Sequence, residues 1–193
     1  MTALPQASFS EGDNNIYREA LNKLVDENIY FLRQGRCLIA DMEPDNFSSL
    51  KDHSGHGSIG AHFRHCIDMY QCFFDGLPES LIDYTNRARD KSIENLCEKA
   101  ERKLVEHIYR LLELRENPPA DFKVNILFLT DTEDSGPVTQ KIPSSILREL
   151  FTLSSHTVHH YALIAQILQA NDLECPAHFG VAPSTLAYWK KNE

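Results

Sequence analysis

The sequence predicts an all-α protein, a four-helix bundle with a small β-hairpin inserted before its last long helix. Four long segments repeat apolar residues every three or four positions, which is the period of an amphipathic helix. One further stretch alternates between apolar and polar residues, as a strand does. The 193 residues suit one domain. We therefore expect a single domain over residues 1–193, with a flexible N-terminus over about 1–14 and a C-terminal tail over about 173–193.

The first helix is expected from about Asn15 to Asp41, because apolar residues recur there at helical spacing. A polar loop with one proline and two glycines follows over Glu43–Gly57. Ser58 then suits the start of a second helix over Ile59–Phe74. A serine oxygen at that position accepts a hydrogen bond from a helical N–H that has no partner within the helix.

The third helix is predicted over Lys91–Glu116, and the two prolines that follow end it. Phe122–Leu129 is rich in strand-forming residues, a turn cluster comes after it, and Val138–Ile142 can return as the second strand of a hairpin. A fourth helix follows the hairpin, capped by Ser144 or Ser145 and reaching Asn171.

The charge and cysteine content restrict the partners and the compartment that we expect. Nineteen basic against 28 acidic residues give a net charge of −9, which argues against nucleic acids and anionic membranes as partners. No apolar run is long enough to span a membrane, and the first residues do not have the pattern of a signal peptide. The five cysteines form no CxxC pair. We expect reduced thiols and a cytoplasmic protein, with a homodimer as one option for its assembly.

Histidines on two predicted helices are the strongest functional signal. His62 and His65 lie three apart on the second helix, and His156, His159 and His160 lie on the fourth. Residues three or four apart share a helix face, and facing helices of a bundle can build a metal site between them. Three imidazoles with an open position suit Zn²⁺, Ni²⁺ or Fe²⁺, and spacing does not choose among these ions.

A helical wheel ranks the histidines by how far they turn toward the core. His156 and His160 form the better inward pair on the fourth helix, with His159 farther toward solvent. On the second helix the wheel prefers His62 to His65. The alternative is that these side chains only form hydrogen bonds in the interior of the bundle.

Two segments, SIGAHFRHCIDMYQCFF and SHTVHHYALIAQIL, resemble the DinB/YfiT-like superfamily of four-helix metalloproteins, and the tail FGVAPSTL is similar to the ending of one branch. The pattern of that superfamily is a histidine followed by a short apolar–acidic run, and later an HxxxH. The resemblance therefore implies His65, His156 and His160 as metal ligands, against the preference of the wheel for His62. His62 and His159 would then line the pocket or its rim.

The resemblance also implies a function, a divalent-metal-dependent enzyme acting on a small molecule. Relatives with assigned chemistry include transferases that use a low-molecular-weight thiol, so a thiol S-transferase or a hydrolase-like activity is expected. The alternatives are a bundle that binds a metal or small molecule without catalysis, and a structural protein with no metal.

Three further residues are candidates for the pocket. Asp68 follows His65 by three positions and could orient an imidazole, or it could simply face solvent. Tyr84 and Arg87 lie in a loop between the second and third helices. That loop could clamp a substrate carboxylate above the metal, or it could form ordinary surface ion pairs.

Overall fold

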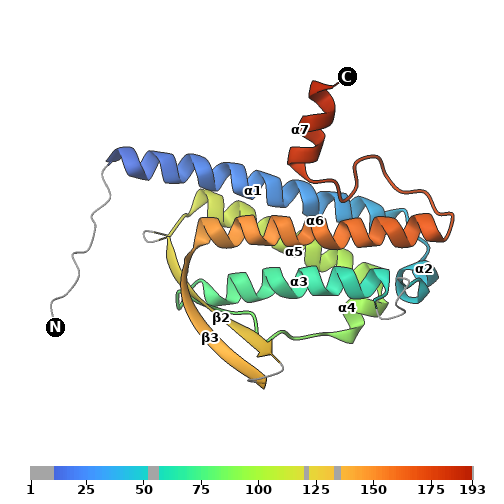
Figure 1. The fold of residues 1–193 in the computed structure, drawn as a ribbon, viewed down its shortest axis with the longest axis horizontal. Helices are drawn as coiled ribbons and strands as arrows, with labels where there is room; N and C mark the ends of the chain where they lie inside the picture. The colour runs from blue at the N-terminus through green and yellow to red at the C-terminus, as the bar shows by residue number, and fades with distance from the viewer. Residues whose placement is uncertain (1–10, 52–56, 120–121, 133–135, 193) are drawn as a thin grey trace.

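The computed structural model describes residues 11–51, 57–119, 122–132 and 136–192, with side chains from residue 15 onward. Figure 1 shows the arrangement of the elements in these ranges. In chain order they are α1 (Glu11–Ala40), α2 (Pro44–Ser49), α3 (Ile59–Gly76), β1 (Leu81–Asp83), α4 (Lys91–Asn95), α5 (Cys97–Glu116), β2 (Lys123–Thr132), β3 (Gly136–Ser145), α6 (Ile146–Ala170) and α7 (Pro183–Lys191).

Four long helices enclose the apolar core. Helix α1 contacts α5 and α6, and α3 contacts the same two helices, so each of the four packs against two of the others. Figure 1 shows the four helices side by side. Each contributes side chains that are fully buried, which removes their apolar surface from water. Examples are Leu21 and Phe31 of α1, Phe63 and Phe73 of α3, Leu104 and Leu111 of α5, and Leu150 and Ile164 of α6.

A buried polar contact fixes α3 against α1 and α6. Asn28 of α1 donates from Nδ2 to the carbonyl oxygens of Leu24 and Leu150, at 2.7 and 3.0 Å. The Tyr70 hydroxyl of α3 donates to Asn28 Oδ1 at 2.6 Å. A buried amide with all of these partners specifies one arrangement of the three helices, because any shift would leave a polar group without a partner.

The strands form a mixed sheet in the order β1-β2-β3. Strand β1 runs parallel to β2, with Ile82 opposite Ile126. Strands β2 and β3 are antiparallel over their whole length, from Lys123 opposite Ser145 to Thr132 opposite Gly136.

The predicted all-α fold class is therefore wrong, because a three-stranded sheet accompanies the helices. The inserted hairpin has strands of 10 residues each, longer than predicted, and β1 adds a strand that the sequence did not indicate. Three residues are too few to show an alternating pattern, and β1 forms because Leu81–Asp83 meets the edge of β2. Most of β3 is exposed, so it has no alternation of buried and exposed residues that would mark where the strand begins and ends.

The predicted helix caps are confirmed. The Ser58 side chain accepts from the backbone N–H of Ala61, and the Ser145 side chain accepts from that of Arg148, at 3.0 and 3.2 Å. The predicted flexible N-terminus is wrong for residues 11–14, which belong to α1, while residues 1–10 lie outside the described residues. Helix α2 lies in the predicted loop, and α7 extends the short turn predicted in the tail.

The third predicted helix is broken at Leu96, whose backbone is extended. The break lets the short helix α4 turn across the start of α3 at Gly60. A Cβ atom on Gly60 would lie 1.9 Å from the carbonyl oxygen of Glu94, so only glycine allows the two backbones to come this close. In the part of the chain that the structure describes, no helix is long and apolar enough to cross a membrane.

Candidate functional site

Three histidines from α3 and α6 meet between the two helices. One ring nitrogen from each of His65, His156 and His160 lies within 4.8 Å of the others. The Nε2 atoms of His65 and His156 are 2.7 Å apart, and the His160 ring centroid lies 4.6 Å from that of each of the other two. All three side chains are partly buried. The side chains that the resemblance implied as metal ligands therefore lie together.

Local sequence and helix contacts together explain this convergence. The Ser58 and Ser145 caps set where α3 and α6 begin. His156 and His160 are four residues apart and therefore project from one face of α6. Since α3 lies against α6, His65 can reach that face from the opposite side.

Burial keeps these imidazoles uncharged. Burial, together with the neighbouring histidines, lowers the pKa of His65 to about 4 and that of His160 to about 2, and Arg87 and Arg64 also contribute at His65. The pKa of His156 is lowered by the same causes, burial first. At neutral pH each ring therefore has one nitrogen with a free lone pair, which is the form that binds a metal.

The other two histidines, His62 and His159, lie on opposite sides of the cluster with respect to solvent: His62 is buried and His159 is exposed. His62 is buried, and its Nδ1 lies 2.9 Å from Nδ1 of His160. Because that contact occupies Nδ1 of His160, it leaves Nε2 of that ring for the three-histidine group. His159 is exposed, with its ring centroid 5.2 Å from that of His160, and it lies at the solvent side.

Asp68 is buried, but its carboxylate pairs with Arg64 at 2.9 Å. Arg64 also binds Glu94 of α4 at 3.0 Å, so this guanidinium joins α3 to α4. Burial raises the pKa of Asp68, and Arg64 opposes that rise. The contact that we considered from the sequence, with Asp68 orienting an imidazole, is replaced by this ion pair.

Arg87 and Tyr84 come from the loop after β1. Arg87 Nη1 lies 2.7 Å from Nδ1 of His65, so Arg87 belongs to the histidine cluster. The Tyr84 hydroxyl instead donates to Glu149 at 2.8 Å, two turns before His156 on α6. Ser144 donates to the second oxygen of the same buried carboxylate at 2.5 Å. Sequence reasoning did not find this Tyr84–Glu149–Ser144 contact, because its members are far apart in the chain.

The cysteines of α3 are unsuited to nucleophilic chemistry. Burial raises the pKa of the Cys66 thiol to about 12 and that of Cys72 to about 11. Both are therefore protonated at neutral pH, and a thiol attacks far more slowly than a thiolate. The imidazoles of the cluster are the reactive groups that remain at this place.

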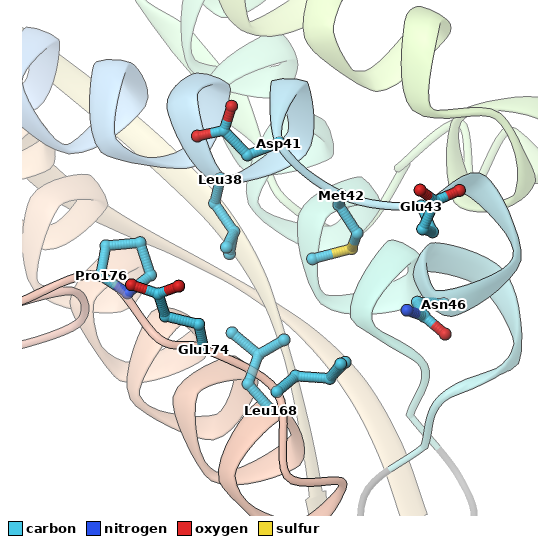
Figure 2. Close-up of a pocket in the computed structure, with 9 residues that line it drawn as sticks. Leu38, Asp41, Met42, Glu43, Asn46, Leu168, Glu174 and Pro176 are labelled. Atoms are coloured by element: carbon cyan, nitrogen blue, oxygen red, sulfur yellow. The ribbon is translucent and has the colours of Figure 1, made fainter.

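A separate pocket of about 560 Å³ lies between the C-terminal ends of α1 and α6 (Figure 2). Leu38, Met42 and Leu168 turn toward its middle, whereas the carboxylates of Asp41 and Glu43 point away from it. The described residues that line this pocket include no histidine, cysteine or basic side chain. The lining combines apolar side chains with the acids Asp41, Glu43 and Glu174, and it does not bring several imidazoles together, so the histidine cluster is the better candidate for a metal site.

Comparison with known proteins finds similarity over part of the chain. No protein-family model matches the chain. FK506-binding protein 5 of Rhizopus delemar is 34% identical over 112 residues, which are 58% of this chain and 28% of that protein. The chain therefore spans less than a third of the length of this curated relative.

These comparisons contradict the resemblance to the DinB/YfiT-like superfamily, and that assignment was wrong. No family model matches, and the similar protein that was found has an unrelated name. The physical reason is that histidines three or four apart occur wherever a helix presents imidazoles on one face, whatever its ancestry. The short histidine motifs describe a local arrangement and do not define a family.

Proposed function

We propose that this protein binds a divalent transition-metal ion through His65, His156 and His160 and uses it in an enzymatic reaction on a small molecule. The observation that supports the proposal is the meeting of three neutral imidazoles, with one nitrogen of each within 4.8 Å of the others. Imidazole nitrogens are common ligands of zinc and of other first-row metal ions, and three of them that converge can hold one ion between them.

The donor set fits such an ion. Imidazole nitrogens bind zinc at about 2.0–2.1 Å, so two ligands of a tetrahedral site lie about 3.4 Å apart. The 2.7 Å between Nε2 of His65 and Nε2 of His156 is shorter than this spacing, and the 4.8 Å limit for the group is longer. The rings would therefore have to rotate for all three to reach ligand distance. Three protein ligands leave a further position open, as in catalytic sites.

A bound metal would supply an acidic water or a polarised substrate atom at the open position. The protein would contribute the orientation of the rings, with His62 holding His160 through their Nδ1 atoms. A low-molecular-weight thiol as the second reactant stays a prediction. If the metal binds and no reaction is found, the alternative is a binding protein that uses the same three histidines.

The setting of this activity is also part of the proposal. We expect the cytoplasm, because all five cysteines are free thiols, which a reducing compartment preserves. We expect a small-molecule substrate and no nucleic-acid partner, given the net charge of −9. The name of the Rhizopus protein gives FK506 as the ligand of that protein, and its match covers too little of it to extend that ligand to this chain.

The experiment is a measurement of metal content on protein purified without a polyhistidine tag and reconstituted with Zn²⁺, Ni²⁺ or Fe²⁺. We expect about one equivalent of metal per chain in the wild type. His65→Ala, His156→Ala and His160→Ala should each lose it. His159→Ala is the matched control, because His159 is an exposed histidine on the same helix, and it should keep its metal.

Two outcomes would change this conclusion. A wild-type protein that takes up none of the three ions would refute the metal site and the enzyme with it. Loss of metal in His156→Ala but not in His65→Ala would make His62 the third ligand instead of His65.

A further inference from the structure

Arg87 is a cation beside the histidine cluster that has no carboxylate partner. Ion pairs account for four other arginines, Arg36, Arg64, Arg110 and Arg115. Among the described residues no carboxylate pairs with Arg87, and its buried Nε atom has no hydrogen-bond partner. The side chain is half-buried between two exposed neighbours, Asn86 and Ala88. A partly desolvated guanidinium of this kind needs an anion to offset the loss of water.

The loop is anchored so that Arg87 reaches the site. Asp83 at the end of β1 accepts from the backbone N–H and the hydroxyl of Thr85, at 2.9 and 2.6 Å. Tyr84 is held by Glu149 of α6. These contacts tie Thr85 to the end of β1 and Tyr84 to α6, and Arg87 then extends to His65.

The contact with His65 cannot persist when a metal binds. A guanidinium only donates hydrogen bonds, so Nδ1 of His65 must be the acceptor and its proton must be on Nε2. If the metal takes Nε2, the proton moves to Nδ1 and faces the N–H groups of Arg87. If the metal takes Nδ1, the acceptor is occupied. In either case the bound metal removes the hydrogen bond between Arg87 and Nδ1 of His65. The same metal would have an open position for a ligand close to Arg87.

We propose that Arg87 then binds a carboxylate, and that the substrates of this protein are small carboxylic acids. The inference rests on the proposed metal site. A guanidinium matches a carboxylate through two parallel hydrogen bonds. A monoanion also suits the charges near the cluster. Arg64 already pairs with Asp68 and Glu94, whereas Arg87 forms no ion pair with a described carboxylate and is available to a ligand.

The test uses protein loaded with Co²⁺, whose visible absorption responds to a ligand at the open position. Acetate is titrated at constant ionic strength into wild type, Arg87→Met and Arg89→Met. Arg89 is the matched control, because it is an exposed arginine on the same loop and its substitution removes the same charge. We expect Arg87→Met to raise the Kd for acetate about tenfold or more, which is about 1.4 kcal/mol. Arg89→Met should bind acetate as the wild type does.

Arg87→Lys keeps the charge but loses the paired hydrogen bonds, and it should lie between wild type and Arg87→Met. This second variant keeps the test valid if Arg87→Met folds poorly, which a thermal melt would reveal. Equal acetate affinity in wild type and both Arg87 variants, with Co²⁺ bound in all three, would refute the carboxylate site and leave the metal site intact. A wild type that takes up no Co²⁺ would refute both proposals.

Discussion

His62 illustrates how a side chain beside a candidate ligand can matter as much as the ligand. It is buried on α3, one turn before His65, and its Nδ1 lies 2.9 Å from Nδ1 of His160. When His160 donates from that nitrogen to His62, the lone pair of its Nε2 atom is left for the metal. The helical wheel selected His62 because it lies beside the apolar stripe of the helix, and its burial in the structure suits a residue that orients a ligand.

We expect His62→Ala to weaken Zn²⁺ binding about 10- to 100-fold without abolishing it, as loss of an orienting partner does in other metal sites. The measurement is a competition titration against a chromophoric chelator. His159→Ala, on the solvent side of His160, should change the affinity little. Complete loss of metal in His62→Ala, equal to that in His65→Ala, would contradict this role and make His62 a ligand.

At the scale of elements, the contact between α4 and α3 positions the helix that carries His65. It depends on Gly60, where an added Cβ would lie 1.9 Å from the carbonyl oxygen of Glu94 and 2.7 Å from the Phe47 ring. Neither neighbour can yield easily, because one is backbone and the other is a buried ring. Arg64 adds to the same contact by binding Glu94.

We expect Gly60→Ala to lower the free energy of unfolding by about 1–3 kcal/mol, the usual result of overpacking a close contact. Urea denaturation measures this, and metal affinity measured on the same variant should also fall, because α3 must shift. Wild-type stability in Gly60→Ala would show that α4 can move away at no cost, and the contact would then not position the site.

For the whole molecule, the buried His107 connects stability to pH. It is fully buried on α5 and stacks between the rings of Tyr70 and Phe74. Burial lowers its pKa to about 4, from 6.5 in the unfolded chain, and the nearby Glu106 only partly opposes this. Between these two values the unfolded chain binds more protons than the folded one, so stability falls as the pH falls.

The contribution of His107 to stability is fully present above pH 6.5 and is lost progressively toward pH 4. We expect the wild type to lose about 2 kcal/mol more than His107→Leu does between pH 7 and pH 5. Urea denaturation of both proteins at the two pH values measures the difference. Parallel losses in the two proteins would show that His107 does not cause the acid sensitivity.

The sequence by itself determined the features that depend on residues close together in the chain. Apolar spacing located the long helices to within a few residues at most ends, and the Ser58 and Ser145 caps were correct. The pairing of His156 with His160 on one face of α6 also follows from local spacing. The hairpin was predicted, with its strands too short.

Only the tertiary structure decided the features that depend on contacts between distant segments. Strand β1 exists because β2 lies beside it, and the third helix breaks at Leu96 because α4 turns against Gly60. The wheel favoured His62 over His65, and the resemblance that favoured His65 was wrong as a family assignment. It is the contact of α3 with α6 that brings His65 to His156, and the loop after β1 that brings Arg87 to His65. The spacing of residues in the sequence predicts which face of a helix or strand a side chain occupies. It does not predict which distant segment of the chain packs against that face.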